Sequence, residues 1–83
     1  MKTIYKYRIT GKPISLPYGY KILTVGFSDE SPCVWVELDS EAECTEKLYI
    51  DYIGTGWVVP GTGIYVGTVM SPDGFVCHVY REE

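Results

Sequence analysis

Apolar and polar residues alternate one by one along most of this chain. The alternation runs through residues 3–9, 20–27, 33–38, 47–53, 64–70 and 75–81, and glycine, proline or polar clusters interrupt it. A period of two residues is typical of a β-strand with one buried face. The pattern therefore predicts five to six short strands.

These strands predict an all-β fold in a single domain over residues 1–83. No segment of ten residues has helical periodicity, and residues 39–46 allow at most one short helical turn, capped by Asp39 or Ser40. Two hairpins are expected, one with a loop of about five residues at 28–32 and one at 71–74. We predict a small antiparallel sheet or a partly open barrel.

The alternation also assigns side chains to faces. Leu23, Val25 and Phe27 share one face of their run, and Val34, Val36 and Leu38 share one face of theirs. In the last run Phe75, Cys77 and Val79 lie opposite Val76, His78 and Tyr80, with either set toward the core. Pro13 and Pro17 should keep residues 14–19 unpaired, with Leu16 turned inward.

Size and charge limit the classes of function. A chain of 83 residues has one small core, so association into a homo-oligomer would add buried surface. A net charge of −4 argues against binding to duplex nucleic acid, which depends on neutralising phosphates. No signal peptide or long apolar run indicates secretion or a membrane, so we expect a cytoplasmic protein.

Cysteine and histidine usage predicts neither a metal nor a cofactor. The three cysteines Cys33, Cys44 and Cys77 form no Cys-x-x-Cys pair, and His78 is the one histidine of the chain. We expect all three cysteines to be reduced thiols packed as small apolar side chains.

Residues 53–63 hold the strongest candidate for a site. Gly54-Thr55-Gly56 and a second Gly-Thr-Gly triplet centred on Thr62 surround the apolar tip at Trp57. The favoured interpretation is that the glycines are turn or bulge positions. The alternative is a cradle of backbone N–H groups for phosphate, with the Thr55 and Thr62 hydroxyls as donors.

The sequence leaves three roles open for Trp57. Its indole can fold back on the sheet, form a contact surface for a subunit or partner, or stack on a nucleobase. Together with the basic face of the first strand, at Lys6 and Arg8, a stacking ring and a glycine cradle would suffice to hold a phosphorylated nucleotide. The alternative for Lys6 and Arg8 is a solvated strand face.

Catalysis has little support in the sequence. Cys77 and His78 are adjacent on a strand, so their side chains point to opposite faces. Glu37 with Asp39 or Asp51 would form a carboxylate pair, but acidic residues along a strand are typical of a solvated face. We therefore expect a binding protein and not an enzyme.

Several segments together resemble a family of small uncharacterised proteins encoded by tailed bacteriophages. The segments that carry the resemblance are residues 1–7, 19–25, 32–35, 54–56, 65–68 and 75–80, and they occur in order over nearly the whole chain. The resemblance implies a phage protein that acts in the cytoplasm of the bacterial host. It brings no established activity or catalytic residues.

Two functions follow as hypotheses. The first is an anti-defence protein that sequesters a nucleotide immune signal of the host, of cyclic or ADP-ribose type, at Gly54, Thr55, Gly56, Trp57, Thr62, Lys6 and Arg8. The second is an inhibitor or adaptor that binds a host protein through the Trp57 loop. Hydrolysis of such a signal is a third and less favoured function.

Overall fold

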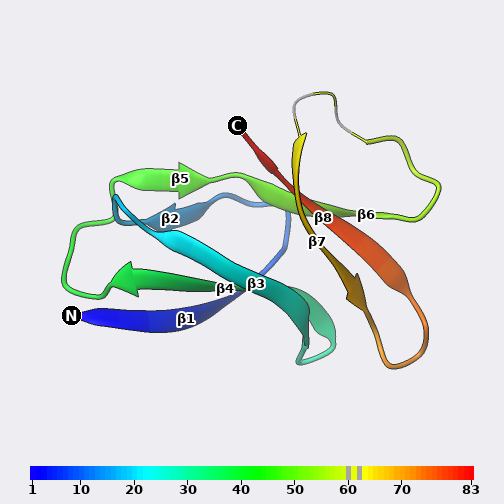
Figure 1. Cartoon of the computed structure of the whole chain (residues 1–83), viewed down its shortest axis with the longest axis horizontal. Coiled ribbons are helices and arrows are strands. Elements are labelled where there is room, and N and C mark those ends of the chain that lie inside the picture. Colours follow the sequence, from blue (N-terminus) through cyan, green and yellow to red (C-terminus); the bar gives the residue numbers. More distant parts are fainter. Residues whose placement is uncertain (60, 62) are drawn as a thin grey trace.

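Antiparallel strands make up the regular structure of the chain (Figure 1). The structure, a computed structural model, describes residues 1–59, 61 and 63–83. Its strands are β1 (Lys2–Arg8), β2 (Ile14–Leu16), β3 (Lys21–Ser28), β4 (Ser31–Asp39), β5 (Glu46–Leu48), β6 (Ile50–Gly54), β7 (Gly63–Met70) and β8 (Val76–Glu82). These described residues contain no helix, which confirms the all-β class. They form eight strands in three sheets, where the sequence predicts five to six strands in one small sheet or a partly open barrel.

The two larger sheets share one connectivity. Their orders are β1-β4-β3 and β6-β8-β7, so in each sheet the last strand of the set lies between the other two. Figure 1 places them in different halves of the molecule, with the small β2-β5 sheet beside the first of them. The molecule is flat, with extents of 39 × 29 × 17 Å.

One core lies between these sheets. In β4, Val34, Val36 and Leu38 are at most 5% exposed, which confirms that they share a buried face. The other apolar residues of the core are Ile9, Leu16, Leu48, Ile50, Val69, Cys77 and Val79. The burial of Leu16 confirms its inward orientation.

The chain reverses between β3 and β4 in a two-residue turn. Asp29 and Glu30 have φ values of 52° and 64°, as both central residues of a type I′ turn do. The predicted loop of five residues is wrong because Ser31 and Pro32 already pair with Ser28 and Phe27 as part of β4. Neither turn residue is glycine, so the usual sequence signal of this turn was missing.

Strands β3 and β7 each contain one irregularity of the β-bulge type. The register shifts at Leu23 in β3 and at Val66 in β7. Because a bulge reverses the alternation, Leu23 is 41% exposed and does not share the face of Val25, which corrects the sequence assignment. The two strands contact each other where Gly67 meets Val25.

Residues 14–16 of the segment 14–19 are paired, contrary to expectation. The three residues of β2 form an antiparallel ladder with β5, and Pro13 and Pro17 lie just outside it. The strand therefore keeps its backbone donors. Residues 39–46 form no helical turn: the Ala42 N–H donates to the Asp39 carbonyl over 3.2 Å in a β-turn.

The hairpin at 71–74 is confirmed. The Ser71 N–H donates to the Phe75 carbonyl over 2.8 Å, and Gly74 has a φ of 92°. Cys77 and Val79 face the core, but Phe75 precedes β8 and is 46% exposed, which corrects that part of the assignment.

The thiols differ in environment. Cys33 and Cys77 are buried and free, and burial raises the pKa of the Cys77 thiol. Cys44 is also free but exposed, so it is not packed as an apolar side chain, because it lies in the turn segment that connects β4 with β5. Within the described residues, no helix is long and apolar enough to cross a membrane.

Candidate functional site

The first Gly-Thr-Gly triplet forms a tight turn at the end of β6. The Trp57 N–H donates to the Gly54 carbonyl over 3.1 Å, and Gly56 has a φ of 91°, which a type II turn requires of its third residue. Turn geometry therefore accounts for Gly56. Thr62, from the second triplet, lies outside the described residues.

Gly54 is needed for a different reason. A Cβ added there would lie 2.9 Å from Cε2 of Trp57, so the indole covers the backbone of Gly54 at close range. The ring thus folds back on the end of the sheet and still remains 62% exposed. Val58 and Val59, which follow it, are 89% and 46% exposed, so the start of the loop presents an apolar surface.

Thr55 is one end of a hydrogen-bonded chain that is the main polar feature of this sheet. Its Oγ1 lies 2.8 Å from Nε2 of His78, and Nδ1 of His78 lies 3.0 Å from Oγ1 of Thr68. The Thr68 oxygen in turn lies 2.6 Å from the Tyr65 hydroxyl. These four residues, from the 54–57 turn, β8 and β7, form a continuous hydrogen-bonded chain, which we call the hydroxyl–imidazole chain.

The hydroxyl–imidazole chain lies on the outer face of the β6-β8-β7 sheet. Cross-strand pairing puts Thr68 opposite His78 and puts Tyr65 opposite Tyr80. The Tyr65 and Tyr80 rings meet edge to face with centroids 5.6 Å apart. Since Cys77 and Val79 face the core, His78 and Tyr80 belong to the opposite side, as the alternation predicts.

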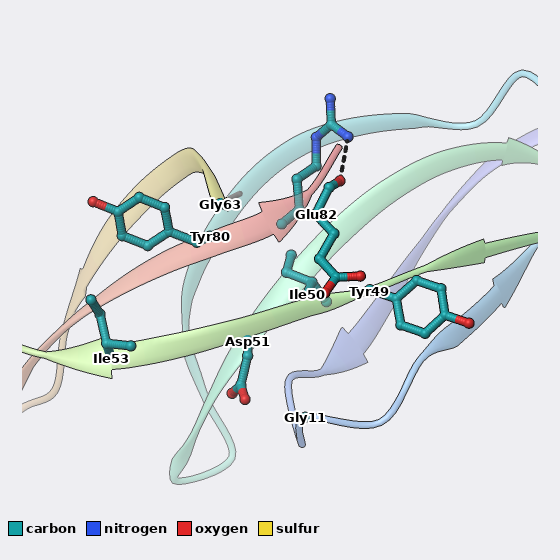
Figure 2. Close-up of a pocket in the computed structure, with 9 residues that line it drawn as sticks. Gly11, Tyr49, Ile50, Asp51, Ile53, Gly63, Tyr80 and Glu82 are labelled. Atoms are coloured by element: carbon teal, nitrogen blue, oxygen red, sulfur yellow. Dashed lines mark hydrogen bonds between the residues drawn. The ribbon is translucent and has the colours of Figure 1, made fainter. Parts of the chain in front are cut away.

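A cavity of about 270 Å³ adjoins this face (Figure 2). Its lining residues are Gly11, Tyr49, Ile50, Asp51, Ile53, Gly63, Tyr80, Arg81 and Glu82. Tyr80 belongs both to this cavity and to the aromatic pair with Tyr65, so the cavity and the hydroxyl–imidazole chain are parts of one surface. The cavity is small, partly aromatic and open to solvent on one side.

The charged residues of the cavity are held by local contacts. Nη1 of Arg81 donates to the Glu82 carbonyl over 3.1 Å. Oδ1 of Asp51 accepts the Tyr52 N–H over 2.8 Å, and the carboxylate reaches Gly11, where an added Cβ would lie 3.2 Å from Oδ2. Asp51 is the cross-strand partner of Tyr80, so the two side chains share one face of the sheet (Figure 2). One cation and two anions thus line the cavity.

The structure does not bring Lys6 and Arg8 to this surface. Both lie on β1, in the other large sheet and across the molecule from the turn at residues 54–57 in Figure 1. Nζ of Lys6 contacts Asp29 at 2.6 Å and Ser28 at 3.0 Å. The hydrogen bond raises the pKa of Lys6 and lowers that of Asp29, so this lysine is paired with the β3–β4 turn.

The aromatic ring beside these cations is Trp35, because it is the cross-strand partner of Lys6. The carboxylate pairs considered for catalysis are also separated, since Glu37 is on β4 and Asp51 on β6. No group of three or more His, Cys, Asp or Glu residues is placed to hold a metal ion in the part of the chain that the structure describes.

Comparison with known proteins gives one result. A family model described as a domain of unknown function, DUF7352, matches residues 1–83. The chain belongs to this family. Neither curated proteins nor solved structures gave a match.

The structure also brings together residues for which the sequence predicts no site. Tyr65 and Thr68 lie in residues 65–68, one of the segments that carry the family resemblance, but the sequence predicts no site there. Both ring nitrogens of His78 have hydrogen-bond partners. The sequence contained a signal for this pairing, because the predicted hairpin at 71–74 fixes the register that places Thr68 opposite His78.

Proposed function

We propose that this protein binds and sequesters a nucleotide signal of cyclic or ADP-ribose type without converting it, as a phage protein in the cytoplasm of its bacterial host. The observation that carries the proposal is that an aromatic cavity and a chain of hydroxyl and imidazole groups share one sheet face. Phage origin and the anti-defence role rest on the family resemblance of the sequence.

The cavity suits a nucleobase. Tyr49, Tyr80 and Ile53 offer aromatic and apolar surface, and stacking of one base on an aromatic ring is worth roughly 1–3 kcal/mol. The carboxylates of Asp51 and Glu82 can accept hydrogen bonds from amino or ribose hydroxyl groups.

Phosphate groups would contact the polar side of the surface. Arg81 is the cation of the cavity, and Thr55 and Tyr65 provide the hydroxyl groups at the two ends of the hydroxyl–imidazole chain. Two lining carboxylates oppose a highly charged ligand. We therefore expect diesters or diphosphates to bind better than triphosphates.

Sequestration is favoured over hydrolysis by the surroundings of His78. Thr55 and His78 resemble a nucleophile and its base, but the second ring nitrogen contacts the Thr68 hydroxyl and no carboxylate. A carboxylate in that place orients the imidazole and stabilises its charged form, and its replacement by an amide costs about 10⁴-fold in kcat in a serine protease.

The test measures whether a nucleotide is removed from solution and whether it is recovered unchanged. The protein is incubated with ADP-ribose and with a set of cyclic dinucleotides, then heat-denatured, and the solution is assayed. Intact nucleotide that disappears on incubation and returns on heating supports sequestration, whereas altered nucleotide supports a hydrolase. Depletion of none of these nucleotides contradicts both.

Matched variants locate the site. Tyr49→Ala removes a ring from the cavity rim, and Tyr18→Ala removes one that is 85% exposed and outside the cavity. The first should weaken binding roughly 5- to 150-fold, as expected for 1–3 kcal/mol, and the second should leave it unchanged. Equal effects would show that the cavity is not the binding site.

A second candidate function rests on the exposed loop. Trp57, Val58 and Val59 form an apolar surface of the kind found in protein interfaces, so this surface would bind a host protein or a second copy of the chain. Trp57→Ala distinguishes the roles. Loss of nucleotide depletion assigns Trp57 to the ligand, and a lower mass in light scattering assigns it to a homo-oligomer. Loss of one host protein after cross-linking in a bacterial lysate, with depletion unchanged, supports the inhibitor.

A further inference from the structure

In the hydroxyl–imidazole chain, whether one end can donate a hydrogen bond outward depends on whether the other end can. Those ends are the hydroxyls of Thr55 and Tyr65, and His78 with Thr68 connects them. A hydroxyl has one proton to donate, and a neutral imidazole has one N–H and one lone pair. The position of each proton in the chain therefore fixes the next.

Two neutral arrangements keep every bond. If Nδ1 carries the proton, His78 donates to Thr68 and Thr68 donates to Tyr65, so the Tyr65 O–H is free to donate outward and Thr55 can only accept. If Nε2 carries the proton, all directions reverse, so Thr55 donates outward and Tyr65 can only accept. A neutral chain thus offers one donor and one acceptor.

A third arrangement arises when the imidazole takes up a proton. His78 then donates to both threonines, Thr68 still donates to Tyr65, and both ends have a free O–H. Imidazole is the side chain that can gain a proton near neutral pH. The titratable or charged groups on the same face are Asp51 on β6, Tyr65 on β7, and Tyr80 and Glu82 on β8.

We propose that Thr55 and Tyr65 are the ligand-contacting ends of the site, and that they bind a ligand with two acceptor groups while His78 takes up one proton from solvent. The inference rests on the proposed function and makes His78 the residue that sets specificity. Its predicted ligand has two phosphates, or a phosphate and a second acceptor group.

The sheet sets the spacing of the two groups. Thr55 follows β6 and Tyr65 is on β7, and these strands flank β8 on opposite sides. Neighbouring strands are about 4.8 Å apart, so the two outer strands are separated by roughly 10 Å. Oxygens of a single phosphate group are too close together to reach both ends, which favours a dinucleotide-like ligand over a mononucleotide.

The first experiment needs no ligand. Because the chain has one histidine, its ring ¹⁵N signals are unambiguous, and they are followed with the ring ¹³C signal of Tyr65 during a pH titration. Tyr65 should respond with the midpoint of His78. Thr68→Val should remove the Tyr65 response and leave the His78 titration, and Thr68→Ser should restore it. A Tyr65 signal that does not follow His78, or that follows it equally in Thr68→Val, overturns the inference.

The second experiment uses ADP-ribose and cyclic di-AMP as probes. Calorimetry in two buffers of different ionisation enthalpy should give an uptake of about one proton per bound ligand above the His78 midpoint, and none in His78→Gln. Binding without proton uptake overturns this inference and leaves the proposed function standing. If neither nucleotide binds but the Tyr65 signal still follows His78 in the pH titration, the proposed function is overturned, and the coupling between the two ends of the chain stands.

Discussion

Gly67 lies where β7 of one large sheet contacts β3 of the other. A Cβ at this position would lie 2.7 Å from Cγ2 of Val25, well inside the 3.4–4 Å of ordinary van der Waals contact. Val25 is half-buried against the core, so its side chain has little room to withdraw. Gly67→Ala should therefore push β7 away from β3.

The magnitude follows from two opposing effects. Overpacking in a well-packed region costs about 1–3 kcal/mol, and replacing glycine by alanine returns about 0.4–1 kcal/mol through the unfolded state. The net loss should be about 1–2 kcal/mol. For a domain of this size that corresponds to a decrease in Tm of roughly 4–16 °C.

Urea and thermal unfolding of a double-mutant cycle test this reasoning. Val25→Ala removes the clashing methyl group, so Gly67→Ala should become neutral or slightly stabilising in that background. Gly61→Ala is the control, since nothing lies within 4 Å of its added Cβ. If the cost of Gly67→Ala is the same with and without Val25, the proposed contact does not limit the packing.

Four other changes test separate parts of the structure. Glu30→Gly should stabilise the fold by about 1 kcal/mol, measured by urea unfolding, because Glu30 has a φ of 64° and glycine adopts such a φ without strain. Ser71→Ala should destabilise it by about 1–2 kcal/mol in the same assay, because the buried Ser71 hydroxyl accepts the Phe75 N–H over 2.9 Å and donates to Asp73. The hydrogen bond with Lys6 lowers the pKa of Asp29 in the folded protein, so Asp29 contributes to stability above its ordinary pKa of 3.8 and loses that contribution as the pH falls through the lower folded value. Tm measured over a series of pH values should therefore decrease on the acid side, and Lys6→Met should make this decrease smaller. Timed alkylation followed by mass spectrometry should modify Cys44 in the folded protein and spare Cys33 and Cys77 until urea is added, and equal rates for the three thiols would contradict their assigned burial.

Local pattern was enough to assign most side chains to a face. Val34, Val36 and Leu38 alternate with half-polar residues, and burial follows that alternation in the structure. It failed at Leu23, because a bulge adds one residue without changing composition. The local pattern also failed at residues 28–32, because the turn residues Asp29 and Glu30 do not include the glycine that is typical of a type I′ turn.

The site was only partly predictable for a related reason. Thr55 and the turn glycines come from one segment, so the sequence could identify them together. Lys6 and Arg8 were joined to that segment by chemistry alone, and strand order, which no local signal encodes, places them in the other sheet. The partner that Thr55 does have is His78 on β8, and His78 in turn contacts Thr68 on β7 through the register of one hairpin.

The position of β8 has a consequence for synthesis of the protein. It is the last of the eight strands along the chain and the middle one of its sheet, so β6 and β7 have no ladder partner in that sheet until residues 76–82 leave the ribosome. Until then β6 and β7 expose unpaired backbone edges. His78 arrives with the strand that covers them, so a nascent chain lacks the imidazole of the hydroxyl–imidazole chain until both edges can be paired. The complete hydroxyl–imidazole chain and the protection of these edges from aggregation should therefore appear together, when β8 joins the sheet.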